Sequence, residues 1–128
     1  MCHQTVSLTA RHLEANGVPT VIIGSALDIV EHCGVPRFLF TDLPLGNPLG
    51  HPGDAREQAA VVSEGLDLLA RAGAPGTTVH AAVRWSDDDD WRQRYAEVRP
   101  EDRARLHAEG DARRAQREQL KAEVRVRD

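Results

Sequence analysis

The amino-acid sequence predicts a small α/β domain, in which a parallel sheet carries flanking helices, followed by a charged helical tail. Two observations support this prediction. Short runs rich in β-branched and aromatic residues, typical of buried parallel strands, occur at residues 20–24, 37–41 and 77–83. Stretches with helical spacing of apolar residues alternate with these runs. That alternation favours parallel strands joined by right-handed crossovers.

The chain opens with a predicted helix over residues 4–16. Three apolar side chains fall on one face of it: Val6, Ala10 and Leu13. Thr5 or Ser7 could cap its start, and Asn16 followed by Gly17 is a typical C-terminal stop signal. A parallel α/β unit normally has a strand before its first helix. We therefore expect either a small sheet or a preceding strand that this sequence does not contain.

Two further helices follow. The first is predicted at about residues 26–33, with Ser25 as its N-cap and Gly34 as its stop signal. The second is predicted at about residues 55–72, with Asp54 as its N-cap. Its apolar side chains have helical spacing and are expected to face the core: Ala59, Val62, Leu66 and Leu69.

Charge divides the chain into an α/β domain at residues 1–85 and a charged tail at residues 86–128. The domain holds 5 basic and 8 acidic side chains, whereas the shorter tail holds 11 and 12. The tail therefore lacks the apolar residues for a core. We expect a solvated or frayed helix with many i, i+4 ion pairs, or a helix that pairs with a partner. Trp91 and Tyr95 could dock its first turn, after four aspartates, on the domain.

Composition excludes several classes of function. A net charge of −4 without a basic stripe disfavours nucleic-acid binding. No apolar run approaches the length of a membrane span, and the N-terminus lacks the pattern of a signal peptide. We therefore expect a cytoplasmic protein without a membrane partner, whose two cysteines are reduced.

Cys2, next to His3, is the leading candidate for chemistry. A thiol at a helix start is favoured as the thiolate, and it would be nucleophilic or redox-active. The alternative is a cysteine without function at a frayed terminus. Cys33 is predicted to be a small buried hydrophobe, although it could also form a disulfide with Cys2. We predict no metal site, because the neighbouring Cys and His residues lack the usual spacers between zinc ligands.

The loop at residues 42–53 contains three prolines and three glycines. Gly46 and Gly50 permit positive φ angles or a close backbone approach, so the loop N–H groups could bind a carboxylate. The loop matches no phosphate-binding glycine motif, and a rigid crossover is the alternative. Asp42 and His51 flank it and could handle protons or orient a substrate, or simply lie at the surface.

Several short segments together keep the order and spacing of a known family. They are Cys2-His3-Gln4-Thr5-Val6, Asn16-Gly17-Val18-Pro19-Thr20-Val21, Pro36-Arg37, Phe40-Thr41-Asp42 and Pro44-Leu45-Gly46-Asn47-Pro48. As a set they resemble the selenoprotein B family, which comprises subunits of the glycine, betaine, sarcosine and D-proline reductases. The resemblance covers roughly residues 2–75, and the tail from residue 86 carries none of it.

The resemblance implies a Rossmann-like core and the reductive cleavage of a carbon–nitrogen bond in a small amino acid or amine. In that family a selenocysteine or cysteine attacks the carbon that bears nitrogen, and a second thiol resolves the adduct. A dithiol or thioredoxin-type donor then restores the reduced state. Other reductase subunits are implied as partners, and no cofactor is expected in this chain.

Carried over by position, Cys2 and His3 complete a (Sec/Cys)-x-x-Cys-His motif, with Cys2 as the resolving or redox thiol. Four loop residues would bind the substrate carboxylate or shape its pocket: Asp42, Gly46, Asn47 and Gly50. The first member of the motif would lie before Met1, as would the missing strand. We therefore expect the recorded start to be internal to a longer reading frame. The rival interpretation is a non-catalytic binding or structural subunit that has lost the nucleophile.

Overall fold

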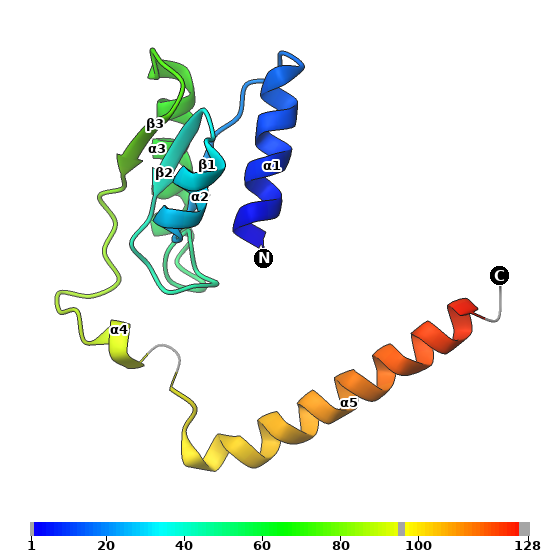
Figure 1. Cartoon of the computed structure of the whole chain (residues 1–128). Coiled ribbons are helices and arrows are strands. Elements are labelled where there is room, and N and C mark those ends of the chain that lie inside the picture. The colour runs from blue at the N-terminus through cyan, green and yellow to red at the C-terminus, as the bar shows by residue number, and fades with distance from the viewer. Residues whose placement is uncertain (1, 95–96, 126–128) are drawn as a thin grey trace. The chain divides into compact units, whose positions relative to one another are not determined.

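The computed structural model describes the backbone of residues 2–94 and 97–125 and the side chains of residues 3–94 and 97–121. Helices and strands alternate in the predicted order (Figure 1). The elements are α1 (Cys2–Ala15), β1 (Ile22–Gly24), α2 (Leu27–Cys33), β2 (Arg37–Phe40), α3 (Ala55–Arg71), β3 (Thr77–His80), α4 (Trp91–Arg94) and α5 (Pro100–Arg125). The chain divides into two compact units between Arg92 and Gln93.

The three strands form one parallel sheet in the order β1-β2-β3. The predicted α/β fold, a small parallel sheet with flanking helices, is therefore confirmed. The outer strands are shorter than predicted. β1 starts only at Ile22, because the N–H of Thr20 donates to Glu14 Oε1 instead of to a strand. β3 has no partner beyond the end of β2, where the N–H of Ala81 donates to the carbonyl of Phe40 at 2.9 Å.

Helices cover both faces of the sheet. Side chains alternate along a strand, so Phe38 and Leu39 point to opposite faces. On the face of Phe38, buried side chains of α1, α2 and β1 pack together: Ala10, Val30 and Ile22. On the face of Leu39, α3 contributes Val61 and Leu68. Figure 1 shows the same arrangement, with α1 and α2 on one side and α3 on the other.

The two crossovers have opposite hands. The strand order moves twice in the same direction across the sheet, whereas α2 and α3 lie on opposite faces. The predicted right-handed connection therefore holds for only one of them, although nearly all such connections are right-handed. The connection through α3 begins with a long loop after Phe40, and this length lets the chain reach the other face.

Local sequence signals explain some helix ends and not others. Asp54 caps α3 as predicted, because its Oδ1 accepts the N–H of Glu57 at 2.9 Å. Gly34 ends α2 as predicted, in the left-handed conformation with φ 66°. Ser25 does not cap α2. Ala26 holds that position without a side-chain bond, while Ser25 Oγ lies 3.4 Å from the hydroxyl of Thr41.

The first helix starts earlier than predicted and buries a different line of residues. Because α1 begins at Cys2, Thr5 and Ser7 lie inside it and cannot cap its start; the Ser7 hydroxyl donates to the carbonyl of His3 at 2.7 Å. Ala10 is buried as predicted, whereas two expected core residues are exposed: Val6 and Leu13. The small side chains of Ser7 and Ala10 let the helix lie close to the sheet.

The predicted core face of α3 is also displaced. The residues buried there are Val61, Gly65 and Leu68, whereas Val62 and Leu66 are 39% and 58% exposed. A Cβ at Gly65 would lie 2.8 Å from Cδ1 of Ile23. The helix therefore approaches the sheet along its glycine, and the larger apolar side chains of the expected stripe turn outward.

The second unit contains α5, a helix whose described side chains are almost all exposed. Arg105 forms ion pairs with Asp102 at 3.0 Å and Glu109 at 2.8 Å, as the charge pattern predicts. Tyr95, for which a docking role was expected, lies outside the described residues. No helix in residues 2–94 or 97–125 combines the length and apolarity needed to cross a membrane.

Candidate functional site at the carboxyl edge of the sheet

All three strands point the same way, so the segments that follow them meet at one edge of the sheet. Open α/β sheets bind their ligands at this carboxyl edge. The start of α1 lies at the same end of the unit as the loop between β2 and α3 (Figure 1). The side chain of His3 marks this position, since a Cβ on Gly24 at the end of β1 would lie 3.2 Å from its Cδ2.

Cys2 is the first residue of α1, so its backbone lies at a helix N-terminus as the sequence predicts. Its side chain lies outside the described residues, and the reactivity of its thiol stays a prediction. His3 follows it at the edge of the sheet. The structure therefore brings the Cys-His pair to the end of the domain that also carries the glycine- and proline-rich loop.

Asp42, two residues after the end of β2, is paired with an arginine of α4. Arg92 Nη1 donates to Asp42 Oδ1 at 2.8 Å, and its Nη2 donates to the other carboxylate oxygen. These hydrogen bonds, opposed by desolvation and aided by charge attraction, lower the pKa of Asp42 and raise that of Arg92. Asp42 is therefore ionised and already paired, and a cationic ligand would compete with Arg92 for it.

The loop has the backbone that its glycines predict. Gly46 and Gly50 adopt φ angles of +100° and +111°. Two of its N–H groups are used inside the loop, however. The N–H of Asn47 donates to the carbonyl of Pro44 at 2.9 Å, and that of Gly50 donates to Asn47 at 3.2 Å. A carboxylate ligand would therefore need other donors or a rearranged turn.

Gly50 also allows the close approach that the sequence suggests, and the approaching group belongs to the protein. A Cβ at Gly50 would lie 2.7 Å from the carboxyl carbon of Glu57. The Glu57 carboxylate accepts the N–H of His51 at 2.6 Å, and the same oxygen lies 2.9 Å from His51 Nδ1. The loop is thus folded around a carboxylate supplied by the first turn of α3.

The imidazole of His51 stacks on the indole of Trp85, with ring centroids 4.0 Å apart and planes 13° from parallel. Trp85 comes from the segment after β3, so the pair joins two of the segments at the carboxyl edge. The sequence singled out His51 as a flanking residue but missed Glu57 and Trp85. No sequence spacing could have found them, because the contacts depend on how the loop, α3 and the segment after β3 pack.

A hollow of about 230 Å³ is lined by Trp85, the stacking partner of His51. Its charged and aromatic lining residues are Asp42, Arg84, Trp85, Asp89, Trp91 and Arg92. Trp91 thus contributes to the first unit, as the sequence suggests, and the Arg92 guanidinium lies 4.6 Å from the centroid of its ring. The hollow combines two carboxylates that are both paired with Arg92, two aromatic rings and arginine side chains.

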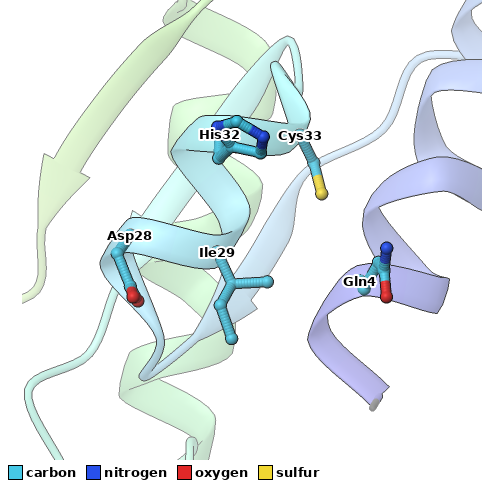
Figure 2. A pocket seen from close by; sticks show the side chains of 5 residues that line it. All are labelled: Gln4, Asp28, Ile29, His32 and Cys33. Atoms are coloured by element: carbon cyan, nitrogen blue, oxygen red, sulfur yellow. The ribbon is translucent and has the colours of Figure 1, made fainter.

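A second, more open hollow of about 550 Å³ lies between α1 and α2 (Figure 2). Its lining consists of Gln4, Asp28, Ile29, His32 and Cys33. The prediction that Cys33 is buried is wrong, because this free thiol is only half-buried and points toward α1. The core side of α2 runs through Val30, three residues earlier, so Cys33 falls at the rim of that face.

Within the described residues, no group of three or more His, Cys, Asp or Glu side chains is placed to hold a metal ion. A disulfide between Cys33 and Cys2 stays a prediction, since the Cys2 side chain lies outside those residues.

Comparison with known proteins gives one informative similarity. Over 78 residues the chain is 30% identical to D-proline reductase subunit gamma of Acetoanaerobium sticklandii. The chain is therefore a distant relative of a reductase subunit. The match covers 61% of the chain, which spans about a third (32%) of the relative's length. No family model and no solved structure matches. The resemblance to the reductase family is thus confirmed as a distant relationship, without a particular member.

Proposed function

We propose that this chain is part of a thiol- or selenol-dependent reductase that cleaves a carbon–nitrogen bond of a small amino acid or amine, as in the glycine, betaine, sarcosine and D-proline reductases. The observation that carries the proposal is the 30% identity to a D-proline reductase subunit. The Cys-His pair at the start of α1, at the carboxyl edge of a parallel sheet, supports it. The protein would act in the cytoplasm together with other reductase subunits.

In this proposal Cys2 is the resolving thiol, and His3 lies beside it. A selenolate or thiolate, which the family motif has three residues before the position of Cys2, attacks the carbon, forms a bond to it and expels the amine, which takes up a proton. The Cys2 thiolate then attacks the sulfur or selenium of the adduct. The bond to carbon breaks, and the carbon takes up a proton. An external dithiol reduces the resulting disulfide or selenosulfide by exchange.

Substrate binding is proposed for the loop residues Asp42, Gly46, Asn47 and Gly50. The hollow beside Asp42 supports a small ligand, and the charged pair of Asp42 with Arg92 could exchange partners with the two charges of an amino acid. A dithiol or thioredoxin-type protein would donate the electrons, with no cofactor bound to this chain.

The test is turnover by the protein isolated with its natural partner subunits. Dithiothreitol-dependent cleavage of D-proline, glycine, sarcosine and betaine would be measured for the natural chain, Cys2→Ser and Cys33→Ser. We expect the natural chain to support turnover of one of these four compounds. Cys2→Ser should abolish that turnover, and Cys33→Ser should retain it. Full turnover by Cys2→Ser would refute the role of Cys2.

The second candidate is a non-catalytic binding or structural subunit. The internal pairing of the loop favours it, because Asp42 is bound to Arg92 and two loop N–H groups close turns. An assembly that cleaves none of the four amines, yet contains this chain in stoichiometric amount, would support this alternative.

A further inference from the structure

We propose that His51 is a proton-transfer residue, held by Glu57 and Trp85, which protonates the nitrogen that leaves during carbon–nitrogen bond cleavage. This inference rests on the proposed function and adds a residue to it. It comes from a place at the carboxyl edge where an imidazole, a carboxylate and an aromatic ring from three segments meet.

The hydrogen bonds define which nitrogen of His51 carries the proton. A carboxylate can only accept, so Nδ1, 2.9 Å from Glu57 Oε2, is the N–H donor of the neutral ring. The remaining nitrogen, Nε2, then has the lone pair. An imidazole whose one nitrogen is bound by a carboxylate is the arrangement that orients a histidine for general acid–base work at the other nitrogen.

The ring is fixed from several sides. The same Glu57 oxygen accepts the backbone N–H of His51 at 2.6 Å, and Gln58 Nε2 donates to the His51 carbonyl at 2.9 Å. Stacking on Trp85 at 4.0 Å fixes the plane of the imidazole. The side chain is still 43% exposed, whereas that of Glu57 is 20% exposed. The carboxylate is thus shielded, and the histidine is open to a ligand.

Gly50 ties the loop sequence to this pair. Any side chain there would collide with the Glu57 carboxylate, whose carbon would lie 2.7 Å from its Cβ. The glycine-rich loop therefore has a structural reason to contain a glycine next to His51. The charged group in contact with the imidazole is Glu57 of α3, and Arg84 precedes its stacking partner Trp85 in the chain.

In the proposed step, the protonated imidazole donates its Nε2 proton to the departing nitrogen as the carbon–nitrogen bond breaks and the attacking thiolate or selenolate bonds to carbon. His51 becomes neutral and regains a proton from water. Glu57 keeps its charge throughout and stabilises the imidazolium. Electrons pass only between the thiols or selenol and the substrate carbon, so His51 undergoes no redox change.

A first experiment examines the 128-residue chain without any activity assay. Nitrogen-15 NMR of the neutral histidines gives the tautomer of His51. We expect the Nδ1–H tautomer in the natural chain and its loss, in favour of the common Nε2–H form, in Glu57→Ala. Glu57→Gln should retain the Nδ1–H form, because its amide oxygen still accepts. Glu64→Gln, on the same helix and without a described ion pair, is the matched control.

An Nε2–H tautomer in the natural chain would overturn the proposal at this stage. The second experiment measures kcat in the isolated assembly for His51→Ala, with and without added imidazole. We expect a loss of about 10²-fold, partial rescue by imidazole, and no loss in Glu64→Gln. Rescue separates proton transfer from a structural role of the side chain.

The outcomes distinguish the two proposals. An active enzyme whose kcat is unchanged in His51→Ala, or is lost without rescue by imidazole, would overturn the role of His51 and leave the reductase function standing. An assembly that cleaves none of the four amines would overturn the reductase function, and with it the proton-transfer step.

Discussion

Replacing Gly50 by alanine should destabilise the first unit far more than the same change at Gly46. Both glycines lie in the same loop with similar φ angles, +111° and +100°, so backbone strain of about 1–3 kcal/mol applies to each. At Gly46 a Cβ would meet nothing within 4 Å, whereas at Gly50 it would overlap Glu57. Displacing that carboxylate breaks its hydrogen bonds to His51, which adds about 1–3 kcal/mol.

Urea unfolding of the 128-residue chain tests this difference. Gly50→Ala should lower the free energy of unfolding by about 2–6 kcal/mol, a large share of the total stability of a small domain. Gly46→Ala should cost only the strain. In a Glu57→Ala background the two glycine substitutions should cost the same, because no carboxylate remains to be displaced. Equal costs in the natural background would refute the reasoning that the loop is folded around Glu57.

Three further predictions follow from other contacts. Asp42→Asn should remove the part of the stability that is lost as pH falls. Because Arg92 lowers the pKa of Asp42 in the folded state, the ion pair stabilises the fold fully above the ordinary pKa of 3.8, and this stabilisation is lost as pH falls through the lower folded pKa. Partial exposure keeps the stabilisation below about 1 kcal/mol. Unfolding of the natural chain and the variant from pH 5 to pH 2 measures it. Iodoacetamide should modify Cys2, at the start of α1, faster than Cys33, which mass spectrometry of the folded chain will show; faster labelling of Cys33 would contradict the assignment. Ending the chain before Pro100 should move the thermal midpoint by only a few degrees, about 1 kcal/mol, because α5 is exposed along its described length; precipitation or a large fall in the midpoint would show that α5 packs on the domain or a partner.

Local signals in the sequence predicted the fold well. The β-branched runs found all three strands, and Asp54 and Gly34 marked helix ends where the structure has them. These signals act within a few residues, through capping bonds and backbone preferences, and do not depend on the rest of the fold.

The buried faces of the helices were harder to predict. Hydrophobic periodicity predicted that Val62 and Leu66 of α3 face the core. The helix packs through Gly65 instead, because the glycine lets its backbone come close to Ile23, and this close packing outweighs the burial of the larger apolar side chains. The hand of the second crossover has the same origin, since it depends on which face α3 covers. The buried face of α3 and the hand of this crossover both depend on tertiary packing, which a short segment of sequence does not specify.

The candidate site shows why a glycine-rich loop is ambiguous in a sequence. A glycine that permits a close approach looks the same in the sequence whether the approaching group is a substrate or a side chain of the protein. At Gly50 that group is Glu57, which orients His51 instead of a ligand. Of the loop residues proposed for substrate binding, Asp42 lines the neighbouring hollow, which is also lined by Trp85, on whose indole His51 stacks.

Trp85 joins the two halves of this site. It stacks on the proposed proton donor and also lines the hollow that holds the Asp42–Arg92 pair. At about 230 Å³ the hollow is smaller than the roughly 300–1,000 Å³ of sites for drug-sized ligands, which suits a small amino acid or amine. A zwitterion there would meet the Arg92 guanidinium, which is already paired with two carboxylates, Asp42 and Asp89. Binding would therefore require exchange of an existing ion pair, so it should be weak and should weaken further with salt.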